Sequence, residues 1–254
     1  RRSGNWPEVL KLLDGPDTPL RAIALRACAG RYDQGVADGL LERLAKDGDS
    51  ARRAAYADLL TRIHKAPGPH KYWGYRPPPR PVNTVAWERT EEIALALGSA
   101  LSKLKALDRL ELLRRMRREA VATEPSFLIA LCDKERDPDI VGVILEALGD
   151  HVPVDAFVKG TLARRLFGPM ARDKTFALRN RLSALVLFAR DLDAKSERQL
   201  LDLARDLEED LLLAEAIKQL AKRRKLASEP FLLAKLESAA PAVRAAACDA
   251  LAEL

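Results

Sequence analysis

The amino-acid sequence predicts an all-α fold without a sheet: a right-handed α-solenoid of stacked helix pairs that forms a single domain over residues 1–254. Aromatic residues make up only 5% of the chain, while alanine and leucine dominate. This composition is typical of helices that pack through small side chains. A turn followed by an amphipathic helix recurs about every 32 to 38 residues, and a period of this length built of helix pairs is typical of solenoids.

The first helix pair sets the pattern. Residues 6–13 show the helical spacing of apolar side chains, and Pro7 suits a first helical position. A turn follows, after which Asp17 or Thr18 is suited to cap a second helix. The buried face of this second helix is predicted to consist of Leu20, Ile23, Ala24 and Ala27.

Later copies of the second helix align on one position, which is held by Arg21, Arg53, Arg109, Val141, Arg179, Leu212 and Arg244. Each later copy follows another amphipathic helix, predicted at Val36–Leu44, Trp87–Leu101, Glu124–Cys132, Val154–Leu166, Ser196–Leu207 and Glu229–Leu236. Because one pair cannot bury its own apolar face, neighbouring pairs must stack. The residues expected to be buried between repeats are Ala24, Ala54, Ile144, Leu185 and Ala247.

The turn-Pro-x-Val-Arg-x-x-Ala-x-x-Ala-Leu pattern is clearest from Pro241 to Leu251. It resembles the short HEAT-like repeats first named for phycobilisome lyases, and the resemblance covers most of the chain outside one insertion. It implies an armadillo-like superhelix and says little about function, since one fold hosts many functions.

Residues 64–86 form a proline- and aromatic-rich insertion between two repeats. The run WGYRPPPRPVNTVAWERTE, from Trp73 to Glu91, resembles a segment of large exported proteins of planctomycete-group bacteria. Those proteins join a sugar-dehydrogenase-like propeller, a HEAT-like region and a c-type cytochrome domain. The resemblance implies an exported or periplasmic parent protein that carries haem c elsewhere, with no cofactor in this region. The start at Arg1 agrees with a fragment of a longer chain.

The insertion is also the first candidate binding site. Proline runs favour polyproline II, which aromatic grooves recognise, and aromatic and arginine side chains are common interface anchors. The candidate binding residues are Trp73, Tyr75, Arg76, Pro77, Pro78 and Pro79. In the competing interpretation, the aromatic side chains fill grooves between helices. We expect residues 64–83 to form an ordered excursion whose ends lie close together, with Trp73 and Tyr75 at least half buried and Arg76 and Arg80 paired.

A second candidate site is a basic stripe on one predicted helix. At 100° per residue, Arg114, Arg115 and Arg118 lie opposite the apolar face of this helix. Nucleic acid or an acidic protein could bind there. In the competing interpretation, these residues are a solvated face near a helix C-terminus.

Chemical signatures in the sequence are few. We find no Walker loop, GxGxxG, GxSxG or HExxH motif, so no catalytic residue is predicted. No CxxC or CxxCH occurs, and the three cysteines are interpreted as buried, unpaired apolar residues. His64 and His70 are interpreted as exposed or hydrogen-bonded loop residues, with metal or haem ligation as the alternative. No apolar run is long enough to span a membrane.

The sequence therefore predicts a non-catalytic binding or scaffold module whose partner is a protein or a neighbouring domain of the same chain. The formal net charge of +6 permits an acidic partner without requiring one. The alternative is a nucleic-acid-binding protein resembling the HEAT-like alkylpurine DNA glycosylases, which use tryptophan, aspartate and arginine in a basic concave groove.

Overall fold

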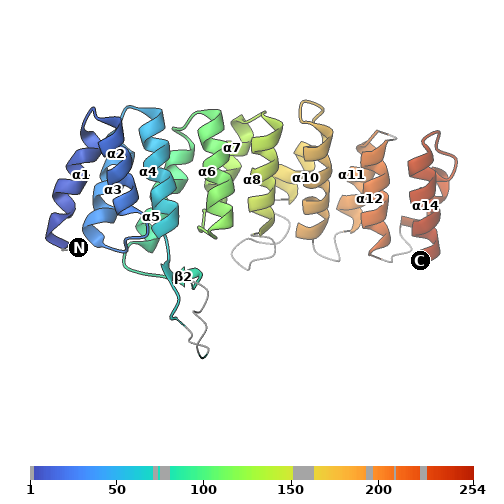
Figure 1. Cartoon of the computed structure of the whole chain (residues 1–254). Helices are drawn as coiled ribbons and strands as arrows, with labels where there is room; N and C mark the ends of the chain where they lie inside the picture. The colour runs from blue at the N-terminus through green and yellow to red at the C-terminus, as the bar shows by residue number, and fades with distance from the viewer. Residues whose placement is uncertain are drawn as a thin grey trace. The chain divides into compact units, whose positions relative to one another are not determined.

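The computed structural model describes residues 3–70, 74, 81–150, 163–192, 197–208, 210–223 and 228–254. This part of the chain is helical apart from one short pair of strands (Figure 1), which confirms the all-α class. The elements are η1 (Ser3–Asn5), α1 (Trp6–Asp14), α2 (Thr18–Cys28), α3 (Gln34–Lys46), α4 (Ser50–Ile63), β1 (Ala66–Pro67), β2 (Asn83–Val85), α5 (Thr90–Leu101), α6 (Ala106–Arg118), α7 (Pro125–Lys134), α8 (Pro138–Asp150), η2 (Ala163–Phe167), α9 (Gly168–Arg172), α10 (Leu178–Asp191), α11 (Glu197–Asp206), α12 (Leu211–Ala221), α13 (Glu229–Lys235) and α14 (Pro241–Glu253).

The chain divides into two compact units, residues 1–131 and 132–254. In the first unit, α1 packs on α2 and α3, α3 packs on α4 and α5, and α4 packs on α5 and α6. In the second unit, α10 packs on α8, α9 and α12, while α14 packs on α12 and α13. Within each unit, helices of one pair therefore contact each other, and several of them also contact a helix of the next pair.

Aspartate caps begin many of the helices. The side chain of Asp17 accepts a hydrogen bond from the backbone N of Leu20 at 2.9 Å, and Asp49 accepts one from Arg52 N at the same distance. Asp33, Asp137 and Asp210 cap α3, α8 and α12 in the same way. Each carboxylate satisfies a backbone N–H that the first helical turn leaves unpaired. The sequence left Asp17 or Thr18 open as the cap of α2, and the structure assigns Asp17.

In four of the second helices, α2, α6, α10 and α14, the fourth residue is an arginine that bonds to carbonyls at or just beyond the end of the preceding helix. Arg21 donates to the carbonyl of Gly15 at 2.5 Å, and Arg109 donates to the carbonyls of Leu101 and Leu104 at 2.8 and 2.9 Å. In α10 this residue is Arg181, whose Nε lies 3.0 Å from the carbonyl of Ala171. The sequence alignment on Arg179 was therefore wrong by two residues; Arg179 instead pairs with Asp139 on α8.

The predicted core is confirmed in most positions and wrong in others. Ala24, Ile144, Leu185 and Ala247 are buried, whereas Ala54 is only half-buried, because α4 turns Tyr56, Ala57 and Leu60 inward.

On α2 the predicted buried face is wrong at two positions, since Leu20 is 45% and Ile23 60% exposed. This helix packs on α1 and α4 and buries Ala24 and Cys28, so neither neighbour covers the face of Leu20 and Ile23.

The boundaries of the predicted first helices agree within a few residues where the structure describes them. Trp87 is the clearest exception, because α5 begins only at Thr90. Residues 151–162, which include most of the predicted helix at Val154–Leu166, lie outside the described residues. All three cysteines are free; Cys28 and Cys132 are buried as expected, but Cys248 is exposed.

Candidate functional site

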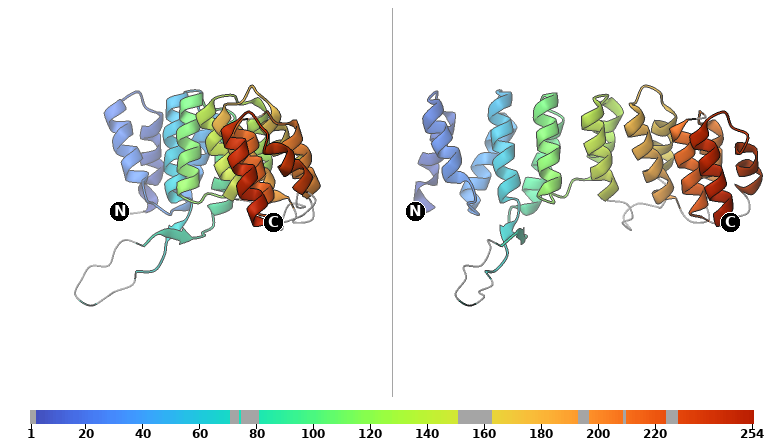
Figure 2. Two further views of the ribbon diagram at one scale, coloured as in Figure 1. Left: turned by 90° about the vertical axis from the view of Figure 1, so that its right-hand side faces the viewer. Right: turned by 45° about the vertical axis from the view of Figure 1, so that its right-hand side comes forward.

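The two ends of the insertion meet in a short antiparallel stalk. Ala66 of β1 lies opposite Val85 of β2, and the backbone N of Gly68 donates to the carbonyl of Val82 at 3.0 Å. In two views the strands lie beyond the ends of the neighbouring helices (Figure 2). The chain thus leaves and rejoins the helices at one place, as the sequence predicted. The strand pair itself was not predicted; it forms because the two limbs must run side by side to close the excursion.

The return limb of the insertion caps the C-terminal end of α4. Three successive carbonyls, those of Arg62, Ile63 and His64, accept hydrogen bonds from side chains of this limb. The donors are Asn83 Nδ2 at 3.1 Å, Trp87 Nε1 at 2.7 Å and Thr90 Oγ1 at 2.8 Å. A helix leaves its last carbonyls without intrahelical partners. The insertion therefore supplies the partners that α4 needs, and these bonds fix the limb in place.

Further contacts hold the return limb from the side of α3. Tyr32, in the connection before α3, donates from its hydroxyl to Asn83 Oδ1 at 3.1 Å. Its ring meets that of Trp87 edge to face, with centroids 6.1 Å apart, a favourable aromatic geometry. Arg89 forms a bidentate pair with Asp38 of α3, with N–O distances of 2.6 and 3.1 Å. The base of the insertion is thus a built structure and not a simple linker.

His64 lies at the centre of this base. The residue is only 1% exposed, so of the two interpretations from the sequence, exposed or hydrogen-bonded, the exposed one is wrong. Burial lowers the pKa of its imidazole to about 4, and the adjacent Lys65 ammonium adds to the effect. His64 is therefore a neutral, buried residue at neutral pH.

The candidate binding residues Trp73, Tyr75, Arg76, Pro77, Pro78 and Pro79 lie outside the described residues, as does Arg80. The structure describes the two limbs on either side of this segment, residues 64–70 and 81–90. The limbs themselves expose apolar surface, because Val82 is 75% and Val85 46% exposed.

The three candidate arginines of α6 all have acidic partners. Arg115 forms an ion pair with Asp58 of α4. Arg114 lies 3.5 Å from Glu111, and Arg118 lies 3.6 Å from Glu119. The side chains of Arg114 and Arg118 are more than half exposed, whereas that of Arg115 is 25% exposed. The structure therefore brings the three onto one helix, as predicted, but with much of their charge balanced locally.

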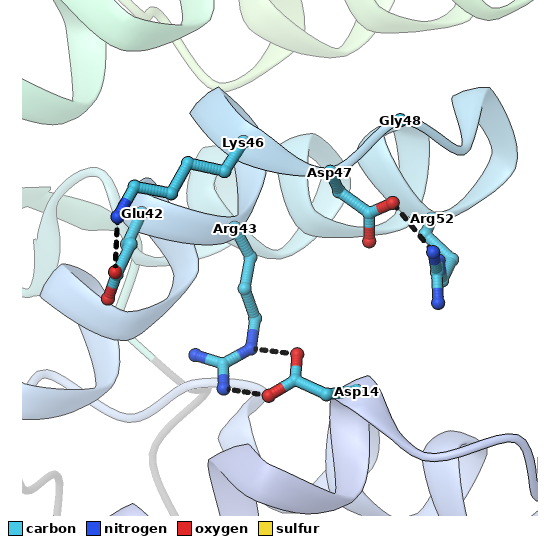
Figure 3. Close-up of a pocket in the computed structure, with 7 residues that line it drawn as sticks. All are labelled: Asp14, Glu42, Arg43, Lys46, Asp47, Gly48 and Arg52. Atoms are coloured by element: carbon cyan, nitrogen blue, oxygen red, sulfur yellow. Dashed lines mark hydrogen bonds and ion pairs between the residues drawn. The ribbon is translucent and has the colours of Figure 1, made fainter.

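A charged cleft of about 470 Å³, which the sequence did not reveal, lies in the first unit (Figure 3). Its lining residues are Asp14, Glu42, Arg43, Lys46, Asp47, Gly48 and Arg52. Arg43 spans to Asp14 with two bonds of 2.8 and 2.6 Å, while Lys46 pairs with Glu42 and Arg52 with Asp47. Acidic and basic side chains are equal in number and paired with one another, so the cleft offers no net charge to a ligand.

The described residues offer little for metal or thiol chemistry. Among the described residues, no group of three or more His, Cys, Asp and Glu side chains is arranged to hold a metal ion. Burial raises the pKa of Cys28 to about 11 and that of Cys132 to about 12, so both thiols are protonated at neutral pH. Within the same residues, every helix is too short or too polar to cross a bilayer.

Neither family models nor curated proteins match this chain. The fold and the site are therefore what define its class: an all-helical protein that carries one anchored insertion.

Proposed function

We propose that this chain is a non-catalytic binding or scaffold module, an α-solenoid of HEAT-like helix pairs that belongs to a larger exported, haem-containing protein. The packing within each unit supports the solenoid, because α1, α3, α4, α10 and α12 each contact helices of their own pair and of a neighbouring pair, as stacked repeats do. The chain contains no CxxCH sequence, so in this proposal the haem belongs to another region of the parent protein.

One observation carries the proposal: the insertion is held by side chains that cap three consecutive carbonyls of α4. A base fixed in this way holds residues 64–70 and 81–90 in place before a partner binds, and preorganisation lowers the entropic cost of binding. The segment contains Trp73, Tyr75 and Arg76, residue types that dominate interface energetics. Its partner in this proposal is a protein surface, either a neighbouring domain of the parent chain or a separate protein.

The α6 arginines support the nucleic-acid alternative less well. Phosphate binding needs several cations that are free to replace counterions, and here Arg115 is committed to Asp58. We expect duplex DNA to bind weakly and to be released at about 0.15 M salt. Tight, salt-resistant binding that is lost in an Arg114→Glu/Arg118→Glu variant would favour the alternative.

The proposal is tested by titrating the chain, in a calorimeter, with the separately produced domains that flank it in the parent protein. Replacing residues 71–80 by a Gly/Ser segment of equal length should weaken binding at least about tenfold, equivalent to roughly 1.4 kcal/mol. The matched control is Arg114→Glu/Arg118→Glu, which should leave binding within about twofold. Equal affinity of the replaced and natural chains would contradict the proposal.

A further inference from the structure

One buried titratable group is not used by the proposed binding function. His64 follows α4 directly and is 1% exposed, and its backbone carbonyl accepts the hydroxyl of Thr90 at 2.8 Å. Within the described part of the chain, the buried Nδ1 of its imidazole has no hydrogen-bond partner. Burying the neutral imidazole costs far less than burying its cation, because a buried charge without a counter-charge is expensive.

The charged residues near His64 do not provide such a counter-charge. Lys65, the next residue, is positive, and it reaches the carbonyl of Ala120 at the end of α6. The carboxylate of Asp58 on α4 is shared between Arg62 and Arg115, and that of Asp38 on α3 is held by Arg89. No carboxylate of the described residues contributes to the titration of His64.

The last carbonyls of α4 already accept hydrogen bonds from neutral groups. A helix C-terminus normally favours positive charge, because its last carbonyls point outward. Here the carbonyls of Ile63 and His64 are already engaged by the neutral donors Trp87 and Thr90. A charged imidazole that turned to these carbonyls would therefore share them with the bonds that hold the return limb.

We propose that His64 is an acid-sensitive latch: protonation of its imidazole releases residues 81–90 from the end of α4. The insertion is then held firmly at neutral pH and loosened in acid. The regulatory meaning of this latch rests on the proposed function, because it matters only if the insertion binds a partner. The latch itself depends only on the contacts between the end of α4 and residues 81–90.

The direction of the pH effect follows from linkage. When residues 81–90 are held on α4, the His64 imidazole has a pKa of about 4. When they are released and the imidazole meets water, its pKa is about 6.5. The open form therefore binds more protons between these values, and acid favours it. The closed joint is fully stable above about pH 6.5 and loses stability as pH falls towards 4. A shift of two to three pKa units changes the ratio of open to closed by about a hundredfold or more.

Hydrogen exchange of the whole chain tests the latch, with labelling at about pH 7 and about pH 4.5 and correction for intrinsic exchange rates. Peptides that cover residues 81–90 should open at least about tenfold more at the lower pH, while peptides from α12 should not change. His64→Gln, which keeps a polar side chain but does not titrate, should abolish the acid sensitivity. Unchanged opening in the natural chain, or equal acid sensitivity in His64→Gln, would overturn the proposal.

A second measurement covers the case in which His64→Gln does not fold. In the natural chain, NMR titration of labelled histidine should show one imidazole that protonates well below pH 6.5, together with loss of the folded signals of Trp87. A value near 6.5 for all histidines would overturn the latch. The two proposals can fail separately. If exchange depends on His64 but replacing residues 71–80 leaves binding unchanged, only the binding role is removed. If replacing residues 71–80 weakens binding but exchange does not depend on His64, only the latch is removed.

Discussion

Arginine side chains bind the ends of neighbouring helices throughout this molecule. Arg21, Arg109, Arg181 and Arg244 each occupy the fourth position of a second helix and donate to carbonyls at or just beyond the end of the preceding helix. A guanidinium has five donors in a rigid plane and keeps its charge when partly buried. It can therefore satisfy carbonyls that the first helix leaves without partners. These four arginines thus have a structural role.

This interpretation predicts that substitution of two arginines of the same helix lowers the free energy of unfolding by very different amounts. Arg181 is 7% exposed and its Nε bonds to the carbonyl of Ala171, so Arg181→Met should destabilise the protein by about 2 kcal/mol. Arg179 pairs with Asp139 at the surface, so Arg179→Met should change stability by less than about 0.5 kcal/mol. Urea denaturation measures both. Equal effects would show that the buried bond does not distinguish the two positions.

The repeat length explains why the sequence selected the wrong arginine. Arg179 is the first arginine of α10 and lies 38 residues after Val141, already more than the 32 or 33 residues that separate other neighbouring copies. The structure places η2 and α9 before α10, and these elements lengthen the connection by enough to bring Arg181 into the equivalent position. A repeat pattern indicates which residues belong to one helix face, but it does not reveal a change in the length of a connection.

Burial was mispredicted for a related physical reason. Periodicity shows that Leu20 and Ile23 share a face with Ala24, but not which part of that face a neighbouring helix covers. His64 stands three residues before Pro67 and Gly68, which predict a loop. Tertiary contacts from Asn83, Trp87 and Thr90 instead make it part of the base. The position of the candidate site was thus predictable, whereas its anchoring depends on long-range contacts.

At the scale of elements, the end of α6 shows how a helix terminates with an unusual residue. Ala120 has a φ of 50°, which is the left-handed region. Its backbone N bonds to the carbonyl of Arg117, and that of Val121 bonds to the carbonyl of Met116. This is a Schellman arrangement, in which glycine is the preferred residue at the position of Ala120. The alanine is strained by its Cβ.

Ala120→Gly is therefore expected to stabilise the protein by about 0.5 to 1 kcal/mol, because relief of strain exceeds the entropic cost of glycine. The matched control is Ala22→Gly in the middle of α2, at a similarly exposed position with helical geometry. There the same change should destabilise by about 1 kcal/mol. Chemical denaturation of the two variants should give shifts of opposite sign, and shifts of the same sign would contradict the assignment of strain.

At the scale of the whole molecule, the chain consists of two compact units. The first unit contains its own buried residues, among them Leu13, Leu40, Leu60, Ile93 and Leu97. Its helices contact their immediate neighbours in sequence or in the next pair. Structures with such local contacts derive stability from each helix pair and from each interface between pairs.

We therefore expect residues 1–135, which comprise the first unit and the rest of α7, to fold alone. Circular dichroism should show a helical spectrum, and urea should unfold the fragment in one cooperative transition with a slope that scales with its size. The anchored insertion belongs to this fragment, so exchange protection of residues 81–90 should be retained. A disordered fragment would contradict the assignment of an independent core to residues 1–131.

The stalk has a consequence for how this chain can vary. Gly68 and Val82 are joined by a backbone hydrogen bond of 3.0 Å. The two ends of the segment between them therefore lie at one place on the scaffold. The free energy of closing a loop rises by only about 0.6 kcal/mol for each doubling of its length. Foreign peptides of different length and composition can therefore be grafted between Gly68 and Val82 while the helices keep their packing.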